Sequence, residues 1–268
     1  AASRLGWRLA DKQVSIAGHG NVGSRLHRLL DTLGVGVTCY DPPLAETGAL
    51  QSTTLSEALQ ADIFSLHVPL QAHGAHPTVH MMNRETLGQM RPGALLVNAA
   101  RGEVVEQAPL ISALQNGRLH AALDVWPGEP DINHSVLLAT TVATPHVAGY
   151  SVEGKARGTR MVYEAFLAWL DSPDKPGTDS PRIVPLDIDW SSIEGSGTDE
   201  VVAQAVMQAT RVRDDDARMR STMPGSAASF DLLRRAHAPR HEFGQLSLSP
   251  PHSEAATSLG KLGFVIRR

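Results

Sequence analysis

Short apolar runs alternate with segments of helical apolar spacing over the first 147 residues, and this alternation restricts the chain to few folds. The runs expected to be strands are 13–17, 35–40, 63–68, 94–98, 120–125 and 140–147. The segments expected to be helices are 22–33, 54–61, 84–90 and 108–116. Strands separated by helices of this length form a parallel sheet covered on both faces. The sequence therefore predicts an α/β fold, a Rossmann-type doubly wound parallel sheet, over residues 1–150.

The pattern changes after residue 150. Residues 151–170 have the apolar stripe of one amphipathic helix, and 171–181 are rich in Pro, Gly and Ser, as linkers are. We expect a small α+β domain over 182–268. Its expected strands lie at 182–189, near 245 and around 264, and its expected helices at 199–213, 227–236 and from Ser253. Asp214, Asp215 and Asp216 are expected to form a solvated helix face.

Composition excludes several classes of protein. The net charge of −4 and the pI of about 6.3 give no electrostatic footprint for nucleic acid or for an acidic membrane surface. No apolar run approaches the roughly 18–20 residues that span a bilayer. The single cysteine, Cys39, cannot form an internal disulfide, which fits a reducing compartment. We expect a cytoplasmic protein with neither nucleic-acid nor membrane partners.

A glycine-rich motif, Gly18-His19-Gly20-Asn21-Val22-Gly23, lies between the first expected strand and the first expected helix. In a dinucleotide-binding loop, Gly18 makes the tight turn, Gly20 lets the backbone approach a pyrophosphate, and Gly23 packs the helix on the strand. The N–H groups at the helix start then face the anion. Glycine turns between strands and helices are common, so a purely structural turn is the alternative.

Asp41 supports the interpretation of this motif as a dinucleotide-binding loop. It lies 41 − 18 = 23 residues after the first glycine, at the end of the second expected strand. A carboxylate there accepts hydrogen bonds from the ribose of a dinucleotide. Its charge repels a 2′-phosphate, and no cation follows it in the sequence to neutralise one, so NAD is favoured over NADP. The alternative is a solvated surface acid.

Three polar segments follow the ends of later expected strands, where ligands bind in open parallel sheets. They are 98–102, 124–130 and 144–149, and they contain Arg101, Glu129 and His146 in that order. Together with the glycine motif and Asp41, this order resembles the D-2-hydroxyacid dehydrogenase family from about Gly6 to Trp169. The resemblance implies oxidation of a small 2-hydroxy acid with NAD as cofactor.

The three residues suit the chemistry of that reaction. His146 is the expected base for the hydroxyl proton, because imidazole titrates near neutral pH. Glu129 would bind the other ring nitrogen and select the tautomer. Arg101 offers a charged planar fork for the substrate carboxylate. Each residue taken singly could be a solvated side chain. His73, His76 and His80 lack acidic or thiol partners nearby, so no metal site is expected.

The resemblance also implies residues that line the cofactor and substrate sites. Asp124 would lie near the nicotinamide, and Tyr150 would reach the substrate beside Arg101. Val68 replaces a residue that often carries a hydroxyl in this family, so a side-chain hydrogen bond would be missing there. The remaining cofactor contacts implied by the family are Asn21, Val22, Ala99, Ala100 and Gly149.

A narrower resemblance covers nearly the whole chain. Residues 66–70 and 149–159 and the tail segments 213–216, 229–234 and 259–264 are similar to the erythronate-4-phosphate dehydrogenases, a branch that acts in vitamin B6 (pyridoxine) biosynthesis. This implies a phosphorylated substrate, 4-phospho-D-erythronate, oxidised to 3-hydroxy-2-oxo-4-phosphooxybutanoate. It also implies a homodimer formed through 182–268, a C-terminal dimerisation domain. Two alternatives stay open: another D-2-hydroxyacid dehydrogenase, or an inactive NAD-binding dimer acting as a scaffold or sensor.

The family resemblance implies a substrate lobe, most of which precedes the nucleotide-binding domain. Only a short segment, Ala1–Asp11, lies before the first expected strand here. We therefore expect an N-terminally truncated form, with 151–170 as the helix that packs on the missing lobe and with the 4-phosphate contacts supplied by that lobe.

Overall fold

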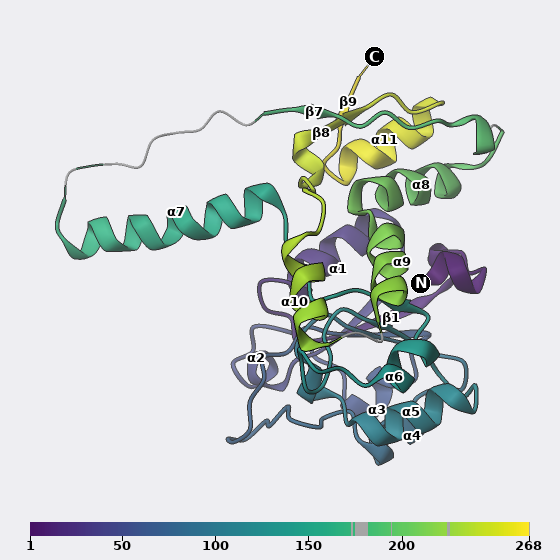
Figure 1. Ribbon diagram of the computed structural model, residues 1–268, viewed down its shortest axis with the longest axis vertical. Coiled ribbons are helices and arrows are strands. Elements are labelled where there is room, and N and C mark those ends of the chain that lie inside the picture. Colours follow the sequence, from purple (N-terminus) through teal and green to yellow (C-terminus); the bar gives the residue numbers. More distant parts are fainter. Residues whose placement is uncertain (173, 175–181, 194, 224–225, 268) are drawn as a thin grey trace. The chain divides into compact units, whose positions relative to one another are not determined.

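The computed structural model describes residues 1–172, 174, 182–193, 195–223 and 226–267 (Figure 1). Its contacts divide the chain into two compact units. Unit 1 comprises Ala1–Ala148 and Arg213–His237, and unit 2 comprises Gly149–Val212 and Ala238–Arg268. The expected linker, 171–181, lies mostly outside the described residues.

Unit 1 is built on a parallel sheet. Its strands are β1 (Gln13–Ala17), β2 (Gly36–Tyr40), β3 (Ile63–Leu66), β4 (Leu95–Asn98), β5 (His120–Leu123) and β6 (Val142–Ala143). Their spatial order is β2-β1-β3-β4-β5-β6, and every neighbouring pair is parallel. The chain therefore leaves β1 toward one edge and returns to β3 on the other side. This order confirms the Rossmann-type doubly wound sheet, whose ligands bind at the carboxyl ends of β1 and β3.

Helices cover both faces of this sheet because successive strand side chains point to opposite faces. Val14, Ile16 and Ile63 join one buried cluster, whereas Ala17 and Phe64 join another. The helices before α7 are α1 (Gly23–Thr32), α2 (Pro42–Glu46), α3 (Leu55–Ala58), α4 (Arg84–Gln89), α5 (Gln107–Gln115) and α6 (His134–Ala139). Short 3-10 turns occur at Ala2–Leu5, Leu9–Asp11 and Gly102–Val104.

Two helices far along the chain also belong to unit 1. These are α9 (Val212–Thr222) and α10 (Ala227–Arg235). Met219, Phe230 and Leu233 are buried in the same cluster as the core of the sheet. The packing of α9 and α10 therefore cuts across the expected boundary at residue 182, although the functional division into 1–150, 151–181 and 182–268 stays a prediction.

The expected solvated face of α9 is wrong for two of its three aspartates. Asp215 and Asp216 are buried, with only 5% and 2% of their surfaces exposed. Asp216 accepts a hydrogen bond from the Ala143 N–H at 2.7 Å and pairs with Arg4 at 2.7 Å and Arg220 at 3.1 Å. Burial alone would raise the pKa of Asp216, but these hydrogen bonds lower it below its ordinary value. The carboxylate is a buried anchor between α9 and β6.

Unit 2 contains a smaller parallel sheet of order β7-β8-β9. Its elements are α7 (Val152–Trp169), β7 (Val184–Pro185), the 3-10 turn Ser191–Ile193, α8 (Thr198–Thr210), the 3-10 turn Phe243–Gln245, β8 (Leu246–Leu248), α11 (Ser253–Lys261) and β9 (Val265–Ile266). Helices α8 and α11 pack together beside this sheet (Figure 1). The helix expected over 199–213 is two helices, because Arg211 takes a left-handed conformation, with φ 53°, and ends α8.

The apolar stripe expected over 151–170 lies on α7 and is exposed. Val162 and Trp169 expose 72% and 75% of their surfaces, and Met161 and Phe166 expose more than half of theirs. Within the described ranges, no helix combines the length and apolarity needed to cross a bilayer.

Candidate active site

The glycine motif follows β1 at the switch point of the sheet, and its three glycines have different surroundings. Gly18 has a φ of +87°, and a Cβ placed on it would lie 2.7 Å from the carbonyl carbon of His67. A Cβ on Gly23 would overlap the carbonyl oxygen of Gly18. A Cβ on Gly20 would meet no atom within 4 Å. Two glycines therefore allow close packing, and the third leaves open space beside the loop.

Asp41 directly follows β2 and is the N-cap residue of α2. Its Oδ2 accepts the His19 N–H at 2.7 Å, and its Oδ1 accepts the Leu44 N–H at 3.1 Å as the cap of α2. The two prolines at 42 and 43 suit the start of α2, where backbone N–H groups have no helical partner. An ionised carboxylate has about four acceptor positions, so Asp41 keeps capacity for ribose hydroxyls.

A cavity of about 250 Å³ lies at this switch point. Gly18, Asp41 and Val68 border it. Its other lining residues are Tyr40, Pro42, Pro43, Leu55, Pro69, Gln71, Ala75, His76, Pro77, Thr78 and Met81. Apolar walls beside a glycine loop and a carboxylate fit the adenosine half of a dinucleotide, so the residues present suit NAD. Asn21 and Val22 lie exposed in the glycine motif.

The loop after β4 presents Arg101. Asn98 holds this loop, because its Oδ1 accepts the Ala100 N–H at 3.0 Å and its Nδ2 donates to the Arg101 carbonyl at 2.9 Å. Gly102 packs so closely on the Trp126 backbone that a Cβ would overlap it. Ala99 is half-buried and Ala100 is buried. Arg101, by contrast, is exposed.

His146 and Glu129 form a direct pair. His146 Nδ1 lies 2.6 Å from Glu129 Oε2, and the Trp126 N–H donates to Glu129 Oε1 at 2.6 Å. The imidazole is 32% exposed, whereas the Glu129 side chain is 18% exposed. In the described part of the chain, no hydrogen bond engages His146 Nε2. The ring is therefore oriented through one nitrogen and keeps the other available.

The turn that carries His146 is organised by Asp124, which is 7% exposed. Its Oδ1 accepts the Thr144 hydroxyl at 2.5 Å and the Val147 N–H at 2.9 Å, and its Oδ2 accepts the Ala148 N–H at 2.9 Å. The His146 N–H also donates to the Asp124 carbonyl at 2.7 Å. Asp124 thus acts as a positioning residue for the turn, and its expected place near the nicotinamide stays a prediction.

Sequence reasoning missed one residue of this framework. Trp126 is almost fully buried, and its Nε1 donates to the Thr144 carbonyl at 2.9 Å. The signal available in the sequence was a bulky tryptophan between two expected site residues.

Gly149 and Tyr150 begin unit 2, where Lys155 Nζ lies 4.3 Å from the centre of the Tyr150 ring. Their cofactor and substrate roles stay predictions.

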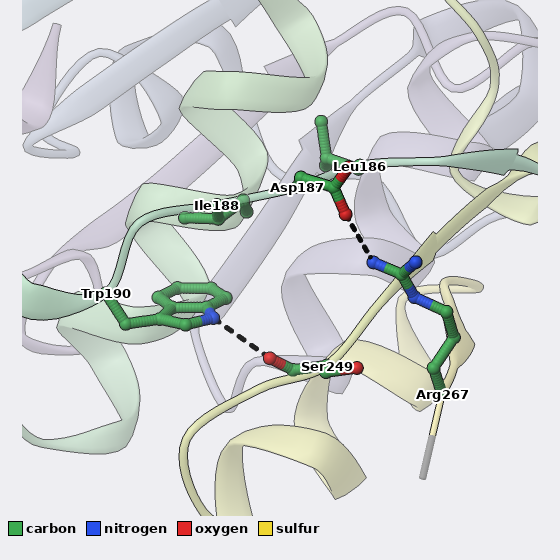
Figure 2. Close-up of a pocket in the computed structure, with 6 residues that line it drawn as sticks. All are labelled: Leu186, Asp187, Ile188, Trp190, Ser249 and Arg267. Atoms are coloured by element: carbon green, nitrogen blue, oxygen red, sulfur yellow. Dashed lines mark hydrogen bonds and ion pairs between the residues drawn. The ribbon is translucent and has the colours of Figure 1, made fainter.

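A second hollow, of about 500 Å³, lies in unit 2 and is lined by Leu186, Asp187, Ile188, Trp190, Ser249 and Arg267 (Figure 2). Arg267 faces Asp187, with Nη2 2.8 Å from Oδ1, and the Trp190 indole donates to the Ser249 carbonyl at 2.9 Å. The positive charge of Arg267 in this hollow is thus paired with the carboxylate of Asp187. Arg101, Glu129 and His146 all lie in unit 1 instead.

Comparison with known proteins agrees with this arrangement. Residues 1–148 match the family described as D-isomer specific 2-hydroxyacid dehydrogenase, NAD binding domain. The chain therefore belongs to the D-isomer specific 2-hydroxyacid dehydrogenase family, a class of NAD-dependent dehydrogenases. Residues 185–263 match a second family, described as a domain of unknown function, DUF3410.

Comparison with individual proteins shows which members of the family the chain is similar to. The chain is 39% identical over 266 residues to the erythronate-4-phosphate dehydrogenase of Proteus mirabilis and 40% identical over 268 residues to that of Yersinia pestis. Both alignments cover 98% of this chain and 70% of the relative. A D-lactate dehydrogenase from Aquifex aeolicus, solved with NAD and lactic acid, superposes with a TM-score of 0.53 at 29% identity. That superposition covers 61% of this chain and 55% of the dehydrogenase chain.

Proposed function

We propose that this chain carries the NAD-binding and acid–base machinery of an erythronate-4-phosphate dehydrogenase. The reaction is the oxidation of 4-phospho-D-erythronate to 3-hydroxy-2-oxo-4-phosphooxybutanoate in vitamin B6 biosynthesis. The observation that carries the proposal is the 2.6 Å contact between His146 and Glu129, because it is the base-and-orienter pair that oxidation of an alcohol requires. The similarity to the Proteus mirabilis enzyme supports the choice of substrate.

His146 acts as the general base. Its Nε2 accepts the proton of the substrate C2 hydroxyl, while Nδ1–H donates to Glu129. Glu129 selects this tautomer and stabilises the imidazolium that forms, without taking the proton itself. The Trp126 N–H holds the second Glu129 oxygen, so the carboxylate is oriented before substrate arrives.

Arg101 binds the substrate carboxylate. A guanidinium offers two parallel N–H donors to a carboxylate, which orients the substrate as well as holding it. The Asn98 hydrogen bonds and the packing of Gly102 keep the backbone of this loop in place. A bound NAD would supply the acceptor for the hydride that leaves C2 of the substrate. Tyr150 is proposed as a further substrate contact, on the basis of the family resemblance alone.

The cofactor seat is proposed to follow the sheet. The backbone from Gly18 to Gly23 would surround the pyrophosphate, and Asp41 would accept hydrogen bonds from the adenosine ribose. The negative charge of Asp41 favours NAD over NADP. The remaining proposed cofactor contacts are Val68, Ala99, Ala100, Asp124 and Gly149.

We also propose a homodimer in the cytoplasm, assembled through residues 182–268. The described sheet of unit 2 supports this interface, because it ends in the strands β7 and β9 and strand edges pair readily with another chain. Size measurement by light scattering tests this proposal, and a monomer at micromolar concentration would contradict it.

The test of the function is substrate choice by the protein expressed from its complete open reading frame. NADH formation is followed with 4-phospho-D-erythronate, D-lactate and D-glycerate in parallel, each with NAD and with NADP. We expect turnover with the first substrate and NAD. Preference for an unphosphorylated acid would instead support another D-2-hydroxyacid dehydrogenase. Binding of NAD without turnover of any acid would support a scaffold or sensor.

A further inference from the structure

Three metal-binding side chains converge beside the glycine loop in unit 1. His19 lies within the loop, His27 on α1 and Cys39 on β2. His19 Nε2 is 3.0 Å from His27 Nδ1, and Cys39 Sγ is 3.4 Å from the same nitrogen. All three ligand atoms lie within 4.8 Å of one another. The β1–α1–β2 turn of the chain brings them together from positions that are distant in sequence.

Hydrogen bonding alone satisfies this cluster poorly. A neutral histidine has one acceptor nitrogen, and two neighbours approach His27 Nδ1. Only one of them can donate to it at a time. The other His27 nitrogen, Nε2, lies 3.6 Å from Asp31 Oδ2. A carboxylate behind the non-ligating nitrogen is the arrangement that orients histidines bound to metal ions.

The spacing suits a tetrahedral ion. With metal–nitrogen bonds of about 2.0–2.1 Å and a metal–sulfur bond of about 2.3 Å, tetrahedral angles place two nitrogens about 3.3 Å apart and nitrogen and sulfur about 3.6 Å apart. The two observed separations, 3.0 and 3.4 Å, differ from these values by a few tenths of an ångström. Cys39 is buried, whereas both histidines are partly exposed, so an ion could enter from the histidine side.

We propose that His19, His27 and Cys39 bind a thiophilic divalent metal ion such as Zn²⁺. When the ion binds, the S–H bond of Cys39 breaks, a metal–sulfur bond forms, and the proton goes to solvent. The ion leaves a fourth position for water.

The site would act on the glycine loop. His19 belongs to that loop, and its backbone N–H donates to Asp41. A dication bound by one thiolate brings a net positive charge next to the place proposed for the pyrophosphate. We expect metal-loaded protein to bind NAD several-fold more tightly, an expectation that rests on the proposed function.

Cobalt provides the direct test, because a Co²⁺–thiolate bond gives a charge-transfer absorption band. Metal-free protein is titrated with Co²⁺ and then competed with Zn²⁺, alongside the variants Cys39→Ser and His27→Gln. His73→Gln, in an exposed loop, is the matched control. We expect a saturable one-to-one band in the parent and the control. It should be absent in Cys39→Ser and require at least tenfold more Co²⁺ in His27→Gln.

Two results would overturn the metal site: no band in the parent protein, or a band that both cluster variants keep unchanged. Circular dichroism of the variants shows whether they are folded, so a lost band is not confused with unfolding. NAD titrations of the same samples separate the two proposals. Failure to bind NAD with the cobalt band intact would contradict the proposed function but leave the metal site standing. Weaker NAD binding by the loaded protein would contradict the coupling.

Discussion

The two ends of the site in unit 1 are built in different ways. At the β1–β2 end, the backbone itself provides the shape: Gly18 turns through a positive φ against His67, and Gly20 leaves open space. At the β4–β6 end, side chains hold the backbone: Asn98 and Asp124 each bind two or more groups of the loops that carry Arg101 and His146. Damage to the first end should therefore affect cofactor binding, and damage to the second should affect turnover.

The largest effect should come from the His146→Ala variant. Loss of the proposed general base should lower kcat about a thousandfold, within the range measured for acid–base residues, while NAD binding changes less than twofold. Stopped-flow NADH formation and fluorescence titration measure the two quantities, with His73→Ala as the control. Loss of NAD binding together with turnover would contradict the assignment of binding and turnover to different ends of the site.

A pair of glycine variants should separate packing from ligand space. Gly18→Ala forces a side chain into a positive φ and against the His67 backbone, so we expect a loss of about 2 kcal/mol in the free energy of unfolding, measured with urea. Gly20→Ala should leave the free energy of unfolding unchanged, since its Cβ meets only open space. It should weaken NAD binding about tenfold, because a Cβ there would keep the backbone away from the pyrophosphate. Equal stabilities of the two variants would contradict this division.

The Asp124→Asn variant tests the role of side-chain hydrogen bonds at the β4–β6 end. An amide cannot accept with both of its polar atoms, so at least one donor of the 144–148 turn is left unsatisfied. We expect a stability loss of about 1–2 kcal/mol and a lower kcat. Thr144→Val, which removes one hydroxyl contact, should cost less. A normal kcat in Asp124→Asn would show that the turn positions His146 without this carboxylate.

A smaller effect, on cofactor binding and not on turnover, should come from Asp41→Asn. Removing the charge should weaken NAD binding about tenfold, equivalent to about 1.4 kcal/mol, and should narrow the preference over NADP. Isothermal titration with both dinucleotides measures this change. Because Asp41 also accepts two backbone N–H groups, a urea melt is needed as a control for local unfolding. An unchanged ratio of the two affinities would remove Asp41 from cofactor selection.

Local patterns allowed much of unit 1 to be predicted. The sequence predicts the strand at 13–17 to the residue, and the six expected strands and four expected helices of unit 1 occur in the expected order, whereas α2 and α6 were not expected. These elements are determined by apolar periodicity and by glycine and proline positions, which act over a few residues. The expected grouping of Arg101, Glu129 and His146 rests on the family resemblance. Within the described residues, the structure places His146 in contact with Glu129.

Long-range packing explains where those patterns failed. The run of aspartates at 214–216 is typical of a solvated face, yet Asp216 lies buried beside Ala143, Arg4 and Arg220, the first two of which are distant in sequence. The apolar stripe of α7 shows a related limit, because periodicity predicts one apolar face and the described structure leaves that face exposed. Periodicity identifies which residues share a helix face, and it does not identify what that face contacts.

The sequence by itself determined the alternating elements, the glycine turn and the position of Asp41, because each depends on the conformational preferences of neighbouring residues. Only the tertiary structure decided which side chains hold those elements together: Asp124 on the His146 turn, Asn98 on the Arg101 loop and Asp216 on β6. It also brought His19, His27 and Cys39 into one cluster. These contacts join residues from separate elements, so their partners are defined only when the sheet has formed.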